Sequence, residues 1–187
     1  MASIINDTFV LPESEIGYYM SVDLETTIRE LAPGLLRYCR ARMRDLSLAE
    51  EIAQDSLVAL VQRWRGSGPP NSPEAFVFAI ARRRAGRVLR RRSLWLPLQL
   101  LAGARDHAPD PEATAVSRSD CTILHRALDR LGSRDREVLL VTALGGLKAS
   151  DAAQALGISE SALKMRTMRA RHRLAAILEN GNATSDR

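Results

Sequence analysis

The sequence has few of the residues that build metal centres, disulfide frameworks or membrane spans. Its two cysteines, Cys39 and Cys121, lie far apart, so neither a disulfide framework nor a C-x-x-C motif is available. The three histidines have no ligand spacing among themselves, which argues against zinc. No stretch approaches the roughly 18 to 20 apolar residues of a membrane span, and the N-terminus lacks a secretory signal pattern. We therefore expect a cytoplasmic protein with reduced thiols, no metal, no cofactor and no membrane insertion.

Lysine is also scarce. Of the 27 basic residues only Lys148 and Lys164 are lysine, and the formal net charge is +5. A guanidinium makes forked hydrogen bonds to phosphates and base edges that an ammonium cannot make. An arginine-rich chain therefore favours a nucleic-acid partner. A genome rich in G and C would also encode arginine, so the positions of the arginines must decide.

Helical periodicity occurs in two segments of the chain. The first runs from Asp23 to about Arg92, with breaks at Pro33, 45–47 and 66–73, and the second runs from about Asp120 to Glu179. No convincing run of alternating β-branched residues occurs, so we predict an all-α fold of two small helical domains. Each domain should bury its own core.

Proline and glycine mark the boundaries between these segments. Pro97, Gly103, Pro109 and Pro111 interrupt the region between them, which indicates a flexible linker. The predicted organisation is a flexible arm, a first domain, a linker, a second domain and a tail, at residues 1–22, 23–92, 93–118, 119–179 and 180–187 respectively.

The segment from Ala49 to Trp64 predicts an amphipathic helix. Ser47 and Glu50 have the spacing of a capping box at its start. The apolar stripe consists of Ala49, Ile52, Ala53, Leu57, Leu60, Val61 and Trp64. The opposite stripe carries Glu51, Asp55, Val58 and Gln62, with Gln54 beside them. The sequence pattern leaves open whether this polar stripe faces solvent or a partner.

The next helix carries a cluster of arginines. Ser72 and Pro73 mark its start, with the hydroxyl as cap and proline in the first turn. Its predicted core stripe is Phe78, Ala81, Ala85 and Val88. Seven of the eleven residues from Arg82 to Arg92, here called the arginine cluster, are arginine. Such a cluster repels itself unless a polyanion neutralises it, which favours nucleic acid.

The second segment has the spacing of a helix-turn-helix. Ala153, Gly157 and Leu163 occupy its small-residue, turn and core positions. Gly157 can adopt the left-handed conformation that a tight turn demands, and Ser159 is placed to cap the second helix. Small alanines before the turn allow the two helices to cross closely. This pattern predicts DNA binding, with a helical hairpin for protein contact as the alternative.

The second helix of this motif has an unusual outward face. At 100° per residue, the inward positions are Leu163, Thr167, Ala170, Leu174 and Ile177, and the outward ones are Ser161, Met165, Met168, Arg169 and His172. Methionines suit contact with thymine methyls in a major groove. Four flanking cations, Lys164 and Arg171 on one side and Arg166 and Arg173 on the other, could then reach phosphates.

These patterns together resemble the extracytoplasmic-function group of bacterial RNA polymerase sigma factors. The segments Ala49–Leu57 and Phe76–Arg82, followed by the arginine cluster, are similar to region two of that family. The segment Leu131–Leu139, the helix-turn-helix and Arg169–Arg171 are similar to region four. The likeness covers about residues 24–92 and 120–178, in the order that the family has.

The resemblance implies a function and a role for each group of residues. It implies a transcription-initiation factor without catalysis, whose partners are core RNA polymerase, promoter DNA and an anti-sigma protein. The implied polymerase contact, on the clamp helices of the largest subunit, is Glu51, Gln54, Asp55 and Leu57. The implied minus-ten contacts are Asn71, Ser72, Phe76, Arg83, Arg87, Arg90 and Arg91. The implied minus-thirty-five contacts are Ser161, Lys164, Met165, Arg166, Met168, Arg169, Arg171 and Arg173.

The sequence departs from the family at several of these positions. Family members often have Trp, Asn and Asp where Phe76, Arg83 and Arg87 stand, and often Glu-Ile where Asp151 and Ala152 stand. The promoter sequence therefore does not follow from the resemblance.

Two other functions remain to be weighed. A conventional helix-turn-helix regulator would explain residues 148–175 but would give the polar stripe and the arginine cluster no purpose. An enzyme finds no support, because Gly66-Ser67-Gly68 precedes two prolines and no nucleophile, histidine and acid arrangement occurs. We expect no small-molecule substrate.

Overall fold

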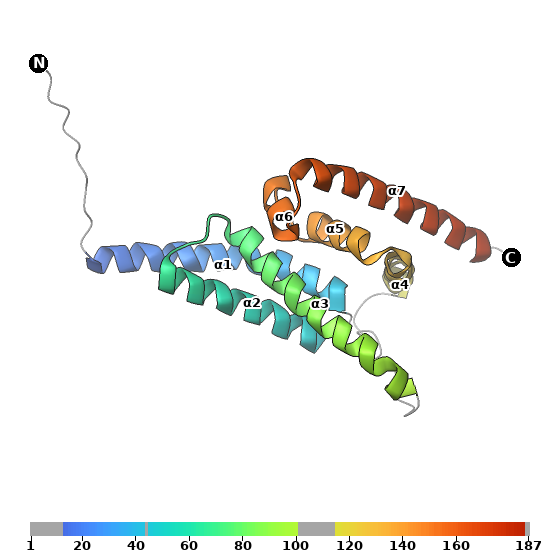
Figure 1. The fold of residues 1–187 in the computed structure, drawn as a ribbon, viewed down its shortest axis with the longest axis horizontal. Coiled ribbons are helices and arrows are strands. Elements are labelled where there is room, and N and C mark those ends of the chain that lie inside the picture. The colour runs from blue at the N-terminus through green and yellow to red at the C-terminus, as the bar shows by residue number, and fades with distance from the viewer. Residues whose placement is uncertain (1–12, 44, 101–114, 186–187) are drawn as a thin grey trace, which may run out of the picture.

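The computed structural model describes residues 13–43, 45–100 and 115–185, and the regular structure within these ranges is entirely helical. The helices are α1 (Glu13–Met43), α2 (Leu46–Ser67), α3 (Pro73–Leu100), α4 (Ala115–Arg130), α5 (Ser133–Leu144), α6 (Ala149–Leu156) and α7 (Glu160–Ser185). We call α1 to α3 the first half and α4 to α7 the second half. Figure 1 shows α1, α2 and α3 on one side of the molecule and α5, α6 and α7 on the other. The predicted all-α fold is confirmed.

Helix α1 is longer than the sequence indicated. It begins at Glu13 and continues through Pro33, so the prediction of an irregular arm over residues 13–22 and of a break at Pro33 is wrong. Leu31 and Leu35, on either side of the proline, are both buried. Tertiary packing on both sides of Pro33 thus outweighs the hydrogen bond that proline cannot donate. Residues 1–12 lie outside the described ranges.

The cap of α2 also differs from the prediction. Asp45, in extended backbone, accepts a hydrogen bond from the Leu48 amide at 3.1 Å, so the helix begins before Ser47. Glu50 does not close a capping box and instead pairs with Arg40 of α1 at 2.9 Å. An Asp side chain caps as well as Ser. The hydroxyl of Ser47 is left exposed in the first turn.

The predicted linker is shorter than expected at both ends. Helix α3 continues to Leu100 and α4 begins at Ala115, so only 101–114 of the predicted 93–118 lies outside the described ranges. The predicted tail is helical as far as Ser185, and residues 186–187 are not described. None of the helices in the described part of the chain has the length and apolar character of a membrane span.

The buried side chains of both halves form one connected cluster. In the first half, the rings of Tyr38 and Phe78 lie with centroids 5.5 Å apart. Helix α1 packs against α5, and α3 packs against α6, which Figure 1 shows as α6 lying beside the start of α3. The predicted cores are present, but they join across the two halves.

The interior of the first half contains a thiol and a phenol that stay protonated at neutral pH. Burial and the nearby Glu137 carboxylate raise the pKa of Cys39 to about 12. Burial, followed by Glu137, also raises the pKa of Tyr38 well above its usual value. Cys39 is a buried free thiol, as expected, whereas the side chain of Cys121 is not among those described.

Candidate nucleic-acid and protein interfaces

The turn between α6 and α7 has the geometry that the sequence predicted. Gly157 adopts the left-handed conformation, with φ 68° and ψ 39°. The Ile158 amide donates to the Ala153 carbonyl at 3.0 Å and the Gly157 amide to the Gln154 carbonyl at 3.1 Å, a paired arrangement that ends α6. The Ala162 amide donates to Ser159 Oγ at 3.2 Å, so Ser159 caps α7.

Helix α7 presents the predicted faces. Leu163 and Ala170 are buried. Met165 and Met168 are 47% and 48% exposed, and the remaining outward positions, Ser161, Arg169 and His172, are exposed too. A surface methionine pair beside cations is an apolar and basic combination that suits a major groove. In the structure this face is uncovered.

The cations that flank this face are held differently from one another. Lys164, Arg171 and Arg173 are exposed and Arg166 is half-buried. Arg173 forms an ion pair with Asp135 at the start of α5, in which its side chain is 62% exposed and that of Asp135 only 13%. A half-buried carboxylate thus orients Arg173 before any ligand arrives. This pair could not be predicted from the sequence, because its members lie far apart along the chain.

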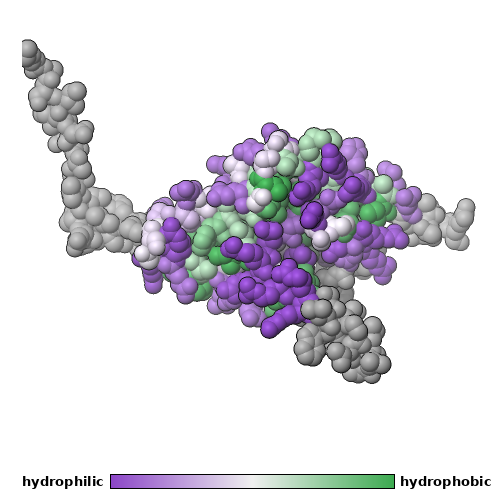
Figure 2. Space-filling model, in the orientation of Figure 1, coloured by the Kyte–Doolittle hydropathy of each residue, from purple (hydrophilic) through white to green (hydrophobic). Residues whose placement is uncertain are grey.

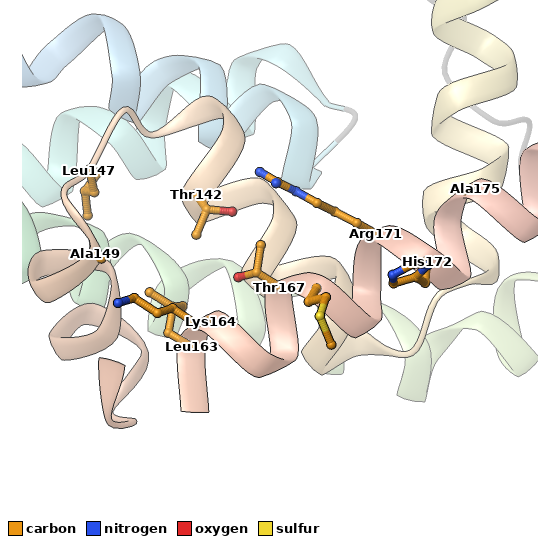
Figure 3. Close-up of a pocket in the computed structure, with 10 residues that line it drawn as sticks. Thr142, Leu147, Ala149, Leu163, Lys164, Thr167, Arg171, His172 and Ala175 are labelled. Atoms are coloured by element: carbon orange, nitrogen blue, oxygen red, sulfur yellow. The ribbon is translucent and has the colours of Figure 1, made fainter. Parts of the chain in front are cut away.

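A groove of about 610 Å³ lies beside the outward face of α7. In Figure 3, Thr142 of α5 and Thr167 of α7 lie opposite each other, with Leu147 and Ala149 at one end. Lys164, Met168, Arg171 and His172 line its α7 side. Sequence reasoning missed this groove, because its walls meet only when α5 packs against α7.

The end of the loop before α3 is buried, whereas the outward face of α7 is exposed. Ser72 is 7% exposed. Its Oγ accepts from the Ala75 amide at 2.9 Å, as the predicted cap should, and donates to Asp151 Oδ1 of α6 at 2.8 Å. Asn71 is exposed and Phe76 is half-buried. The predicted minus-ten loop is thus engaged with the second half.

The arginine cluster forms an exposed basic face on α3. Its members at positions 83, 87, 90 and 91 are exposed, and Figure 2 shows a broad hydrophilic area over the middle of this helix. Arg84 turns the other way and forms an ion pair with Asp55 of α2. Phe76, earlier on the same side of α3, is half-buried and packs against the core. The arrangement can hold a polyanion along one side of α3.

The polar stripe of α2 borders an apolar groove of about 370 Å³ between α1 and α2. Glu51 and Gln54 are exposed, and Leu57 is half-buried. Asp55 forms an ion pair with Arg84 of α3. The groove is lined by Ala32, Leu36, Glu50, Ala53, Gln54, Leu57, Val58 and Val61. The two α1 residues of this lining were not predicted as part of the site, although their spacing of four residues places them on one helix face.

Two family models match the chain in the order of its halves. The model described as sigma-70 region 2 matches residues 27–94. The model described as sigma-70, region 4 matches residues 121–174. The first range contains the α2 stripe and the arginine face of α3, and the second contains the helix-turn-helix.

Curated relatives and solved structures agree with these matches. The chain is 32% identical over 160 residues to the ECF RNA polymerase sigma factor ShbA of Streptomyces griseus subsp. griseus, covering 79% of this chain and 83% of the relative. It is 28% identical over 160 residues to the ECF RNA polymerase sigma factor SigD of Mycobacterium tuberculosis, covering 81% and 74%.

Among solved structures, CnrH in complex with the cytosolic domain of CnrY is similar in fold, with a TM-score of 0.65, 20% identity and coverage of 89% of this chain and 94% of that one. The sigma factor RpoE from Bartonella quintana, in complex with the anti-sigma factor NepR, has a TM-score of 0.63 at 22% identity, with coverage of 84% and 97%.

Proposed function

Because this chain belongs to the extracytoplasmic-function group of RNA polymerase sigma factors, we propose that its two halves contact two different elements of a promoter while α2 docks on core polymerase. The chain directs polymerase to promoters, where the polymerase initiates transcription. It works in the cytoplasm, where polymerase and DNA are found. The polymerase supplies the catalysis, and this chain supplies recognition.

The second half reads the upstream, minus-thirty-five element. The observation that carries this assignment is the uncovered α7 face with its two exposed methionines and Arg169. The methionines contact thymine methyls and sugar edges, and Arg169 makes forked hydrogen bonds to a base edge. Lys164, Arg166, Arg171 and Arg173 hold phosphates on the two sides of the groove and fix the helix there.

The first half contacts the downstream, minus-ten element. The loop at 68–72 and the start of α3 capture an unstacked base, and the arginine face of α3 holds the strand that carries it. The exposed side chains at positions 71, 83, 87, 90 and 91 support this role. Arginine replaces the Asn and Asp that relatives often have at positions 83 and 87, so we expect stronger backbone contact here and less base discrimination.

Core polymerase binds the α1–α2 groove and its polar rim. Glu51 and Gln54 are exposed at the rim and Leu57 lies in the groove. An apolar centre with a polar rim is the usual anatomy of a protein interface. A conventional helix-turn-helix regulator would have no use for this surface, which distinguishes the two functions.

An anti-sigma protein is part of the proposal. Two proteins of similar fold, RpoE and CnrH, are solved in complexes, the first with an anti-sigma factor and the second with the cytosolic domain of CnrY. Such a partner would compete with core polymerase for the exposed apolar surfaces of the chain.

The proposed function is tested by reconstitution. The chain is mixed with core polymerase and passed over a gel-filtration column, and the complex is then used for run-off transcription of genomic fragments. We expect co-migration and discrete transcripts that core polymerase alone does not make. A chain that binds DNA but does not co-migrate with core polymerase would be a conventional regulator instead.

A further inference from the structure

The methionines of the chain differ sharply in their access to solvent. The sequence has five methionines, and the structure describes the burial of the side chains at positions 43, 165 and 168. Met43 of α1 is 2% exposed, whereas Met165 and Met168 of α7 are 47% and 48% exposed. Both exposed thioethers lie on the helix face that is assigned to DNA. An oxidant in solution can therefore reach this face directly.

The thioether sulfur of methionine reacts with peroxides to give methionine sulfoxide. A sulfur lone pair attacks one oxygen of hydrogen peroxide, so that the O–O bond breaks and an S–O bond forms. The other oxygen leaves as water. The sulfur loses the two electrons that the peroxide gains. The reaction converts a flexible apolar side chain into a polar one whose oxygen is a hydrogen-bond acceptor.

The position of the two methionines on α7 separates this reaction from the stability of the fold. Residues three apart lie side by side on a helix, so the two sulfurs share one outward surface. The side chains that fix α7 in the second half point the other way, and Leu163 and Ala170 are 2% and 0% exposed. Oxygen added to Met165 and Met168 therefore enters solvent and leaves this packing intact.

The effect of the sulfoxides on recognition rests on the function proposed above, in which this face contacts thymine methyls. A thymine methyl offers no hydrogen bond to a sulfoxide oxygen, so close contact would strip that oxygen of water without replacement. Loss of one methyl-sized apolar contact is worth about fourfold in affinity, and loss of two roughly fifteenfold. The phosphate contacts of the flanking cations do not depend on the methionines.

We propose that Met165 and Met168 form an oxidation site on the recognition face of α7, at which peroxide-class oxidants produce sulfoxides that weaken binding to the upstream promoter element. The free chain is susceptible because both thioethers are exposed, and bound promoter DNA covers them. Methionine sulfoxide reductases reverse the reaction. The site thus couples the oxidation state of the chain to promoter recognition without a change of fold.

The modification itself is tested on the free, full-length chain. The chain is treated with hydrogen peroxide and then with excess dithiothreitol, which reduces oxidised thiols such as disulfides but leaves sulfoxides. Peptide mass spectrometry should find that Met165 and Met168 are oxidised much faster than Met43, and circular dichroism should show unchanged helix content. Oxidation of Met43 at the same rate, or loss of helix, would overturn the site.

The consequence for recognition is tested with holoenzyme assembled from treated and untreated chains, on a promoter recovered by run-off transcription. Treatment should lower promoter affinity roughly fifteenfold, and methionine sulfoxide reductases should restore it. In the double variant Met165→Leu with Met168→Leu, which starts from its own affinity and keeps the other three methionines, treatment should change nothing. An equal loss in this variant would assign the effect to another residue and overturn the proposal.

A change in the DNA tests the contact that the sulfoxides are proposed to disrupt. Uracil lacks only the methyl group of thymine, so it is placed in turn at each thymine of the upstream element. Untreated holoenzyme should lose about fourfold at a contacted thymine, and treated holoenzyme should lose nothing further there. Losses from uracil and from oxidation that simply multiply would show that the methionines do not contact thymine methyls, and the proposal would fail.

Protection by DNA separates this proposal from the proposed function. Met165 and Met168 should be oxidised more slowly in promoter-bound holoenzyme than in the free chain, and equal rates would overturn the oxidation site as a recognition surface. If untreated holoenzyme bound no promoter, the proposed function would fall and this proposal with it. If untreated and treated holoenzyme bound promoters equally well, only the oxidation site would fall.

Discussion

The loop before α3 and the outward face of α7 are both assigned to DNA, yet the fold holds them differently. Ser72 caps α3 and also bridges to Asp151 of the other half, where it is nearly inaccessible. Ser159 caps α7 in a matching way but is exposed and has no bond to the first half among the described contacts. Both serines cap a helix, but only Ser72 also joins the two halves among the described contacts. Contact between elements distant in sequence makes the difference.

The two proposed binding surfaces also differ in how far their side chains are already engaged in ion pairs. Asp55, on the proposed polymerase surface, is already paired with Arg84. Arg173, beside the outward face of α7, pairs with Asp135, whereas Met165 and Met168 on that face are exposed. A ligand that binds Asp55 must therefore compete with an internal ion pair. DNA, in contrast, can contact the exposed methionines of α7 without displacing another part of the chain.

The largest expected effect is on polymerase docking. Asp55→Arg should weaken binding to core polymerase by about 2 to 4 kcal/mol, because a charge-assisted contact is replaced by a like-charge clash with a basic partner. The measurement is competition with the parent chain for core polymerase.

The ion pair with Arg84 calls for a control in this test, because Asp55→Arg also places two half-exposed cations next to each other. The double variant Asp55→Arg with Arg84→Asp restores the internal pair with its charges exchanged. It should fold like the parent and still dock poorly. Recovery of docking in the double variant would mean that the residue acts on the fold and not on polymerase.

A smaller effect distinguishes the two capping serines. Ser72→Ala should lower the free energy of unfolding by about 1 to 2 kcal/mol, since it removes a cap and leaves Asp151 without its hydrogen bond. Ser159→Ala removes only an exposed cap and should cost about 0.5 to 1 kcal/mol. Urea denaturation of both variants provides the comparison.

The difference between the serines should depend on the bond between Ser72 and Asp151. In an Asp151→Ala chain, where Ser72 has lost its partner in α6, the two substitutions should cost nearly the same. Equal costs in the parent chain would show that the Ser72–Asp151 bond contributes nothing to stability.

The smallest expected effect concerns Arg173. Arg173→Ala should weaken binding to all promoters alike and reduce the slope of log affinity against log salt by about one, as loss of one phosphate contact does. Asp135→Asn is the control, because it keeps the cation and removes only the partner that orients it. A loss confined to particular promoter sequences would assign Arg173 to base recognition.

Local signals predicted the helix-turn-helix almost completely. Gly157, Ser159 and the three- and four-residue spacing of α7 each act within a few residues, and the structure places them as expected. The core stripe of α2 was predicted for the same reason, although Ser56 was missed, which is buried with its hydroxyl donating to the Ile52 carbonyl at 2.6 Å. Periodicity alone could not show that a buried serine hydroxyl would find a hydrogen-bond acceptor in the preceding turn of its own helix.

Contacts between distant segments could not be predicted from the sequence. Glu137 falls in a segment read only as part of region four, and nothing near it in the sequence indicates Tyr38 or Arg42 as partners. The continuation of α1 through Pro33 likewise depends on packing that a local rule does not include. The assignment of residues to polymerase and promoter stays a prediction, because contacts within one chain do not test it.

The central claim, that each half reads its own promoter element, is tested most directly by binding of reconstituted holoenzyme to a library of single-base changes across both elements. Arg169→Ala should lose roughly 1 to 3 kcal/mol and relax preference at one upstream base pair, leaving downstream preferences unchanged. Asn71→Ala should relax preference only in the downstream element. Equal, sequence-independent losses for both variants, or a change of preference in the same element, would contradict the account.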